Sequence, residues 1–432
     1  MVWFYRMFSD YSLPLFTSLK YFLNSFFYGV LFVFSWSSLL AENEVSDSGF
    51  VYYSESQLLH AKAEIAAGNA FFVERYEQLL SESDELLSTA VDSVVNKTMK
   101  TPSGDIHDYI SIAPYRWPDD GTEDGLPWKA IDGVINPVTR GPDTDFARMS
   151  VMFDMVDKLS FAYFFSDDST YSDKCLEVLN VWFVDPETKV NPNINYGQGV
   201  PGYAEGRPAG LIEWVRISNV VTAVQILSQN GVMSEEMLVE MNAWIGRYLD
   251  WVLTSRLGRE ANALPQNHAN WYNYQAVGLL IYMGRVEEAR LRVEDAKVSR
   301  IAAQIEPDGC QPLEVGRTKS MHYSCMNLWA LTNLAYMGRS IGVDLWDFET
   351  DDGRSLRQAF RYLEPYVLRA EVWPYKEISK GGIEVAIRRE LLPLFSKSST
   401  LMETELISGD VDVHHYLSPL AGLRYPPAEI SD

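Results

Sequence analysis

The sequence predicts an all-α protein in which many helices, joined by short loops, form one large array. Three observations predict this class. Apolar residues recur at intervals of three and four through most of the chain after residue 50. Alternating apolar and polar runs bounded by turn residues are scarce, so strands are expected to be minor. No coiled-coil heptad and no obvious repeat is present, which favours a globular helical array.

The segment 234–255 shows the helical pattern best. An acidic first turn, with Glu235 and Glu236 after Ser234, precedes the apolar positions and favours a helix start. The apolar positions at helical spacing are Met241, Trp244, Ile245, Tyr248 and Val252. Similar patterns predict, in chain order, helices over 56–90, 145–166, 170–183, 210–230, 271–303, 319–341, 354–372 and 384–396.

Composition bounds the class of protein. The chain has 432 residues, of which 47% are hydrophobic, so a large core is available and global disorder is excluded. Lys and Arg number 36 against 59 Asp and Glu, which gives a net charge of −23. Nucleic-acid binding needs surplus cations and is therefore not expected, although a local basic pocket remains compatible with this charge. Three cysteines allow at most one disulfide, and neither a metal-ligand spacing nor a cofactor motif is visible.

The N-terminus predicts export. Residues 21–41 carry no charge, Arg6 and Lys20 precede them, and the run ends at Ala41 before a polar stretch. This pattern is typical of a signal peptide over 1–41, and we expect a secreted or periplasmic protein. The run is also long enough to span a bilayer, so a retained membrane anchor is the alternative. Residues 42–432 are then expected to form a single monomeric domain with a C-terminal tail from about 400.

Two long loops, 100–144 and 190–209, interrupt the helices. They are rich in proline and glycine, and loops of this length are usually functional or disordered. Aromatic residues interleaved with Arg and His favour a sugar-binding cleft, where rings stack and polar tips form hydrogen bonds. The alternative is that these aromatics only pack the loops against the helices. The residues concerned are His107, Tyr109, Tyr115, Arg116, Trp117, Trp128, Tyr196, Tyr203 and Arg207.

Asn267 and His268 form the sharpest local feature. They lie between two predicted helices, the second of which is expected to begin near Asn270. The free N–H groups and the dipole of a helix N-terminus favour an anionic ligand. A buried structural histidine is the alternative interpretation.

A second feature runs from Glu314 to Tyr323. If a helix begins near Thr318, then Arg317 and Tyr323 can face one cavity. A guanidinium beside a phenol is expected to lower the pKa of Tyr323 and prepare it for proton transfer, and Glu314 is expected to orient Arg317. A surface ion pair beside a core tyrosine is the alternative.

Four stretches together resemble the alginate-lyase type of polysaccharide lyases, and the similarity covers roughly residues 56–385. Each stretch alone is weakly specific, whereas the four in one chain are specific. They are SGDIHDY from Ser103 with PYRWP from Pro114, the Asn267-His268 pair, PLE from Pro312 through Arg317 to His322-Tyr323, and GLIEWVR from Gly210.

The resemblance implies an incomplete α/α toroid with long cleft-lining loops, and β-elimination in 1,4-linked uronic-acid polymers such as alginate or glucuronan. It implies catalytic roles for Asn267, His268, Arg317 and Tyr323, with no metal or cofactor. Arg317 and Asn267 would stabilise the enolate formed at the uronate carboxylate, as an oxyanion hole does. Tyr323 would protonate the leaving oxygen, and His268 or Tyr323 would remove the C5 proton. The expected substrate-binding residues are His107, Tyr109, Tyr115, Arg116, Trp117, Arg207, Arg216, Trp271 and His322.

Departures from the family pattern concern the substrate rather than the reaction. Gln266 replaces a frequent Asn, Glu213-Trp214 replaces Asp-Thr, and Arg116 stands where an aromatic residue is common. Two other functions remain open at this point. An inverting glycoside hydrolase would need two carboxylates flanking the bond, and a non-catalytic protein would only bind acidic glycans.

Overall fold

The computed structural model describes residues 49–407 and 413–427, which belong to one compact unit. The expected signal or anchor segment, 1–41, lies outside the described residues.

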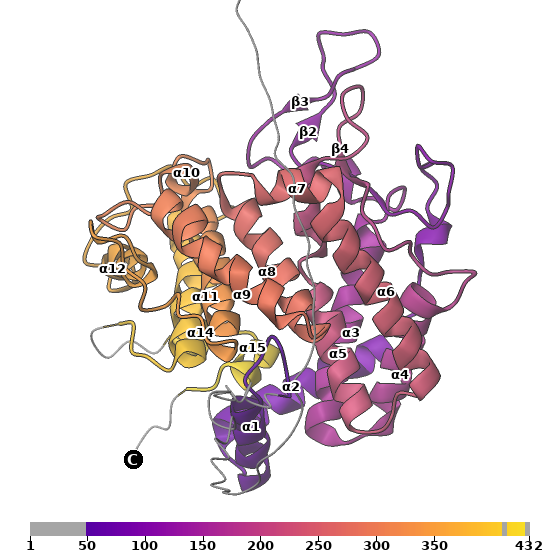
Figure 1. Ribbon diagram of the computed structural model, residues 1–432, viewed down its shortest axis with the longest axis horizontal. Coiled ribbons are helices and arrows are strands. Elements are labelled where there is room, and N and C mark those ends of the chain that lie inside the picture. Colours follow the sequence, from indigo (N-terminus) through magenta and orange to yellow (C-terminus); the bar gives the residue numbers. More distant parts are fainter. Residues whose placement is uncertain (1–48, 408–412, 428–432) are drawn as a thin grey trace, which may run out of the picture. The chain divides into compact units, whose positions relative to one another are not determined.

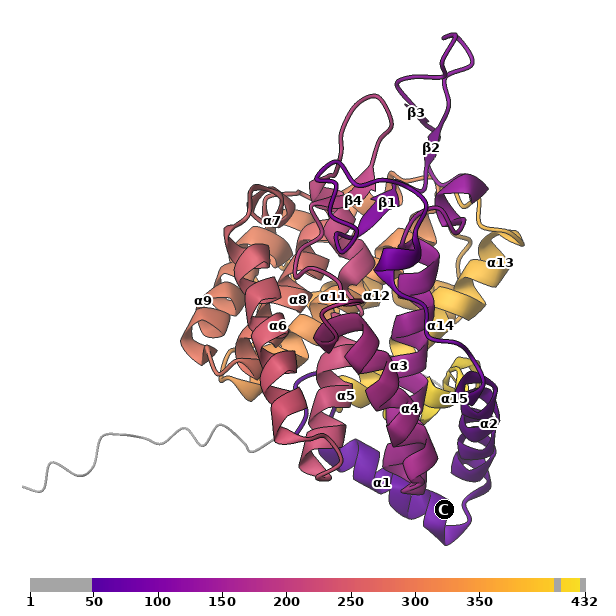
Figure 2. The same ribbon diagram turned by 90° about the vertical axis from the view of Figure 1, so that its right-hand side faces the viewer.

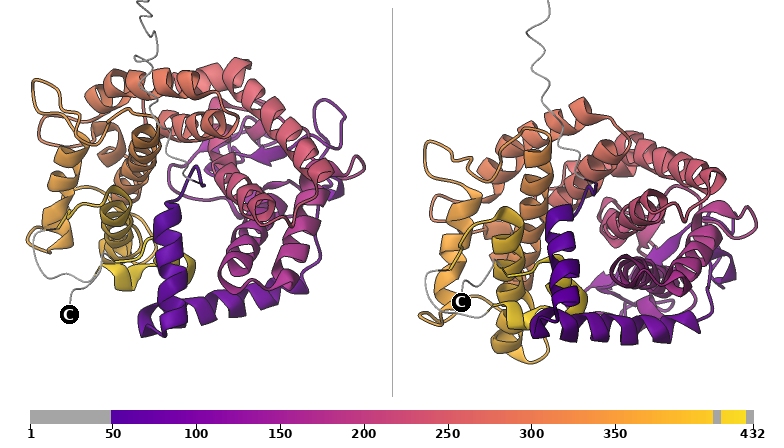
Figure 3. Two further views of the ribbon diagram at one scale, coloured as in Figure 1. Left: turned by 60° about the horizontal axis from the view of Figure 1, so that its bottom comes forward. Right: turned by 90° about the horizontal axis from the view of Figure 1, so that it is seen from below.

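Helices within this unit alternate between an inner and an outer layer (Figure 3). The inner helices are α3 (Phe146–Ser166), α5 (Ile217–Gln229), α8 (Asn267–Tyr282), α11 (Ser320–Ser340) and α14 (Leu392–Met402). The outer helices are α4 (Ser169–Leu179), α6 (Glu235–Thr254), α9 (Val286–Ala296) and α12 (Leu356–Val367). Each inner helix contacts the next inner one, and each outer helix packs against the inner helix that precedes it. This arrangement is an incomplete α/α toroid, the fold that the family resemblance of the sequence implied.

Burial follows the two layers. Inner helix α8 buries most of its residues, whereas outer helix α9 buries only Ala289, Val293 and Ala296. Among the described residues, Pro208–Gln229 is long and apolar enough to cross a membrane, but 78% of its apolar 18-residue window is buried inside the unit. It is therefore a core segment of the toroid.

Glycines divide two of the predicted helices. The segment expected at 56–90 is α1 (Glu55–Ala67) and α2 (Ala70–Leu87), separated at Gly68, whose φ is 82°. Within the segment expected at 271–303, α8 ends before Gly284, whose φ is 72°, and the chain then continues as α9. Glycine adopts this left-handed conformation without steric cost, so it permits the sharp turn at which one helix ends and the next begins.

The long loops and the few described strands lie together at one end of the helices (Figures 1 and 2). Strand β1 (Ile110–Ile112) pairs in parallel with β4 (Tyr196–Gly199), so the two loops predicted to line a cleft are joined. Strand β2 (Arg116–Trp117) pairs antiparallel with β3 (Lys129–Ala130). The N-termini of α8 and α11 reach the same end, and this brings their first turns beside the loops.

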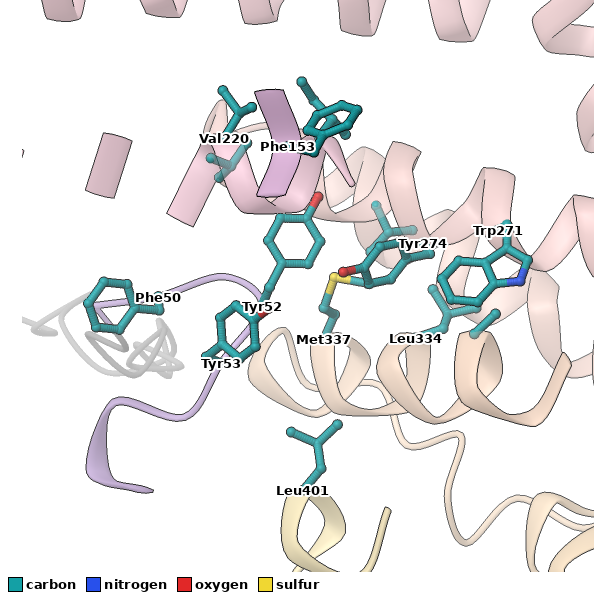
Figure 4. Packing of buried hydrophobic residues seen from close by; sticks show 14 of the residues in the cluster. Phe50, Tyr52, Tyr53, Phe153, Val220, Trp271, Tyr274, Leu334, Met337 and Leu401 are labelled. Atoms are coloured by element: carbon teal, nitrogen blue, oxygen red, sulfur yellow. The ribbon is translucent and has the colours of Figure 1, made fainter. Parts of the chain in front are cut away.

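The opposite end of the toroid is filled by the first described residues. Phe50, Tyr52 and Tyr53 are buried, and Tyr52 lies among residues of the inner helices (Figure 4). Its ring centroid is 5.1 Å from that of Tyr274 on α8. A Cβ atom at Gly278 would lie 2.1 Å from the Tyr52 hydroxyl, so this close approach requires glycine.

The C-terminal segment, expected as a tail, contributes to this packing. Helix α15 (Pro419–Arg424) contacts α1 and α2. The guanidinium of Arg424 pairs with Asp157 on α3 and lies 4.7 Å from the ring centroid of Tyr53. All three cysteines are free thiols, so Cys310 and Cys325 form no bridge.

Candidate active site

A cavity of about 770 Å³ opens at the loop end of the toroid. Its wall is made by the first turns of α8 and α11, by both long loops and by η4 (Pro208–Trp214). Asn267, His268, Arg317 and Tyr323 all line it, so residues up to 56 positions apart in the chain share one space.

Asn267 is held in place by a carboxylate from another helix. It is the first residue of α8 and is completely buried. Glu314, on α10 (Pro312–Val315), accepts hydrogen bonds from the Asn267 backbone N–H at 2.8 Å and from Nδ2 at 2.7 Å. The expectation that Glu314 orients Arg317 is therefore wrong, because its carboxylate caps α8 and fixes the Asn267 amide instead. The second Nδ2 hydrogen remains for a ligand.

His268 is a neutral imidazole. Burial, followed by the positive charges of Arg317 and Arg207, lowers the pKa of His268 to about 4. Its Nδ1 atom is buried and has no hydrogen-bond partner. Because His268 lines the cavity, its neutral ring can accept a proton from a bound molecule.

Arg317 is oriented by Asp132 from the first long loop. Its Nη2 lies 2.6 Å from Asp132 Oδ1, and its guanidinium carbon lies 3.8 Å from the ring centroid of Tyr323. Although burial opposes ionisation, hydrogen bonds from Arg317 and Thr318 lower the pKa of Asp132 to about 2. The carboxylate therefore stays charged and holds the guanidinium against the tyrosine ring.

Tyr323 differs from the sequence expectation in its pKa. Burial and the hydrogen bond with the Tyr115 hydroxyl, 2.9 Å away, raise the pKa of Tyr323 above that of an ordinary phenol. Arg317 acts in the expected direction, but its effect is smaller. The predicted lowering is wrong because a sequence does not show how deeply a phenol is buried. Tyr323 is consequently a neutral phenol, which suits a proton donor.

The structure divides the nine expected substrate-binding residues. The residues that line the cavity are Tyr115, Arg116, Arg207, Arg216 and His322. Arg216 pairs with Asp154 at 2.6 Å. In contrast, Arg116 and Arg207 have no carboxylate within ion-pair distance in the described part of the chain. These two guanidiniums can bind anionic groups of a ligand.

Four expected binding residues lie outside the cavity lining. The His107 ring bonds the Lys189 carbonyl through Nδ1, and Trp117 donates to the Val134 carbonyl. Tyr109 is completely buried, and Trp271 is packed against Tyr274 in the core. For Tyr109 and Trp271 the prediction of substrate contact is wrong, because aromatic residues near a site also pack its supporting walls.

Comparisons with known proteins identify the family of this chain. The sequence model of the alginate lyase family matches residues 93–373. The crystal structure of an alginate lyase from Bacteroides ovatus is 30% identical, with a TM-score of 0.78, over 88% of this chain and 97% of that chain. The chain belongs to the alginate lyase family.

A more distant structure shares the fold of this alginate lyase family member. A histidine-to-alanine variant of alginate lyase A1-III, solved with a tetrasaccharide, is 14% identical with a TM-score of 0.52. That match covers 89% of this chain and 97% of the other. No protein with curated annotation matches the sequence significantly. The protein is a polysaccharide lyase, which replaces the hydrolase and the non-catalytic interpretations.

Sequence reasoning missed several residues that shape this lyase's cavity. Asp132, Arg140 and Gln198 line it but lie in the two long segments predicted as loops, where no local pattern singles them out. Glu213 also lines it; in the sequence it belongs to the GLIEWVR stretch and is a departure from the family pattern, but neither observation assigned it a role in this reaction. Gln198 has a φ of 49°, unusual for a residue other than glycine, and its side chain accepts a hydrogen bond from Arg207 at 2.8 Å. Such backbone strain is not visible in a sequence.

Within residues 49–407 and 413–427, no group of three or more His, Cys, Asp or Glu side chains is placed to hold a metal ion.

Proposed function

We propose that this lyase cleaves 1,4-linked uronic-acid polymers, either mannuronate-rich alginate or glucuronan, by β-elimination that leaves 4,5-unsaturated uronate ends. The observation that carries the proposal is one cavity that combines a neutral imidazole, a neutral phenol and arginines without carboxylate partners. Such a cavity in a chain of charge −23 is suited to an anionic sugar. The alginate lyases among the similar structures support the substrate class.

The first requirement of the reaction is to acidify the C5 proton of the uronate. While the neighbouring carboxylate keeps its full charge, that proton is hardly acidic. Arg317 and the free Nδ2 hydrogen of Asn267 are placed to donate to the carboxylate and to stabilise the enolate that forms. Because Asp132 and Glu314 fix both donors before substrate binds, little reorganisation is needed.

The second requirement is a base and an acid. A base removes the C5 proton, the C4–C5 double bond forms, and the C4–O bond breaks with protonation of the leaving oxygen. Tyr323 donates that proton. When the C5 proton lies on the opposite face of the ring, His268, a neutral imidazole that lines the cavity, is the base. When both groups lie on one face, the neutral Tyr323 hydroxyl donates its own proton to the leaving oxygen as it accepts the C5 proton, so the phenol ends the step unchanged.

Export of the enzyme through residues 1–41 is also part of the proposal. Polymeric uronans do not enter cells readily, so a lyase of this kind needs a route out. N-terminal sequencing of the protein recovered outside the cytoplasm is expected to begin near residue 42. A protein retained in full length in the membrane would instead support an anchor.

A panel of uronans tests the proposed reaction. Polymannuronate, polyguluronate, glucuronan, pectate and hyaluronan are incubated separately with the enzyme, and ultraviolet absorbance is followed. Each elimination creates a conjugated unsaturated uronate, so absorbance is expected to rise with polymannuronate or glucuronan. New reducing ends without a rise in absorbance would show hydrolysis and contradict the proposal.

Salt is expected to act in two directions. The chain of charge −23 repels a polyanion at long range, while the cavity arginines attract it at short range. The screening length falls from about 30 Å at 0.01 M to about 10 Å at 0.1 M, so moderate salt removes the long-range repulsion first. Initial rates at low substrate are expected to rise and then fall as salt increases. A steady fall from the lowest ionic strength would contradict this explanation.

A further inference from the structure

Glu213 is a buried carboxyl group in the cavity wall that the proposed reaction does not use. It lies on η4 and is 7% exposed. Its Oε2 accepts hydrogen bonds from the Tyr109 hydroxyl at 2.8 Å and from Ser111 Oγ at 2.5 Å. Its Oε1 is buried and has no hydrogen-bond partner. The two oxygens of one carboxyl group are therefore in very different environments.

The direction of both hydrogen bonds to Oε2 can be assigned. Ser111 Oγ accepts from the backbone N–H of Gln198 at 2.7 Å, which directs its own hydrogen toward Glu213. Burial is the largest cause that raises the pKa of Tyr109 well above its usual value, and it acts whether or not Glu213 is charged, so this phenol also keeps its hydrogen and donates. Oε2 thus receives two donors, and a proton on Glu213 is placed on Oε1.

The surroundings of Glu213 favour the protonated form of its carboxyl group. In the described part of the chain, no Lys, Arg or His lies within ion-pair distance of the carboxyl group. The charged groups that face it at longer range are Arg140 from η2 (Pro137–Arg140) and Arg207. Burial raises the pKa of Glu213, and this effect exceeds the opposing effects of Ser111, Tyr109, Arg140 and the Gln198 side chain. A polyanion entering the cavity raises the pKa further.

We propose that Glu213 binds substrate as a neutral carboxylic acid, with its Oε1–H donating a hydrogen bond to a carboxylate oxygen of a bound uronate. This inference rests on the proposed uronan substrate. A charged Glu213 would repel that carboxylate, whereas for neutral Glu213 the uronate carboxylate supplies the acceptor that Oε1–H lacks in the free protein. Arg140, which lines the same cavity without a carboxylate partner in the described chain, provides the compensating positive charge.

Binding measured without turnover tests this role. The Tyr323→Phe variant is titrated calorimetrically with a defined mannuronate oligosaccharide from pH 5 to pH 9. Because the bound form needs the proton on Glu213, affinity is expected to be constant at low pH. Above the pKa of Glu213 in the free protein it is expected to fall by up to about tenfold per pH unit. His268, with a pKa of about 4, titrates below this range.

Substitutions then assign the dependence to Glu213. In the Tyr323→Phe background, Glu213→Gln keeps a neutral donor and is expected to abolish the fall in affinity while retaining affinity within about fivefold at pH 6. Glu213→Ala lacks the donor and is expected to weaken binding at every pH. A Glu213→Gln protein that keeps the pH dependence, or that binds as weakly as Glu213→Ala, would overturn the proposal.

A matched pair of tyrosine variants supplies a control. Tyr109→Phe removes one donor that stabilises charged Glu213, so the pH at which affinity begins to fall is expected to move upward. Tyr171→Phe removes a similar bond, 2.7 Å to Asp84, outside the cavity, and is expected to leave the profile unchanged. Equal profiles for both variants would overturn the proposal.

The outcome separates this inference from the proposed function. Suppose that binding of the oligosaccharide depends on pH through Glu213, while the wild-type assay shows no rise in ultraviolet absorbance. This result would reject elimination and leave the role of Glu213 intact. Elimination with pH-independent binding would support the proposed function and overturn the inference. If no uronate binds at any pH, the inference is also overturned.

Discussion

Replacing Tyr323 by phenylalanine is expected to lower kcat by about 10²–10⁴-fold, because general acid catalysis contributes in that range. If the hydroxyl is also the base, the loss is expected at or above the top of that range. The ring stays in place against Arg317, and only the hydroxyl that bonds Tyr115 is removed. The lost hydrogen bond is worth about 0.5–1.5 kcal/mol, so the melting temperature is expected to change by only a few degrees.

The measurement is kcat for the purified variant beside its thermal unfolding curve. Tyr362→Phe is a matched control, because the Tyr362 hydroxyl lies 2.7 Å from that of Tyr375 in a second tyrosine pair outside the cavity lining. This control is expected to keep wild-type kcat. A folded Tyr323→Phe enzyme with more than about a tenth of wild-type kcat would show that the phenol is not the proton donor.

Replacing His268 by alanine is expected to give a loss that depends on the substrate. Where the C5 proton and the C4 oxygen lie on opposite faces, as in guluronate, the base is removed and the loss is expected to equal that of Tyr323→Phe. On mannuronate, whose groups lie on one face, the imidazole only helps to hold the carboxylate. The expected loss there is nearer the ~10²–10³-fold that follows removal of one oxyanion donor.

The two C5-epimeric polymers are compared with the same enzyme preparations. His60→Ala serves as the control, since the His60 ring packs edge-on against Phe72 and does not line the active-site cavity. It is expected to leave both rates unchanged. An equal loss on the two polymers for His268→Ala would contradict its assignment as the opposite-face base. Wild-type enzyme that does not cleave polyguluronate would restrict the role of His268 to carboxylate binding.

Local sequence patterns predicted much of this structure, and long-range packing accounts for what they missed. Helical periodicity identified the inner helices, and the short segments around Asn267 and Tyr323 identified one wall of the cavity. The partner of Arg317 is Asp132, 185 positions earlier in the chain, and no local pattern connects them. Whether a phenol is acidified by an arginine or made less acidic by burial likewise depends on the folded environment, as Tyr323 shows.

The two ends of the described chain lie in contact with each other. The rings of Tyr53 and Tyr425 lie 6.2 Å apart, and α15 contacts α1. An open succession of helices is thereby closed by contacts between its first and last members rather than by a covalent link. The order of helices in space should therefore survive circular permutation, in which residues 50 and 427 are joined by a flexible linker and the chain is reopened elsewhere. The turn at Gly231 between α5 and α6 suits the new termini, because it lies far from the cavity lining and has open space around it.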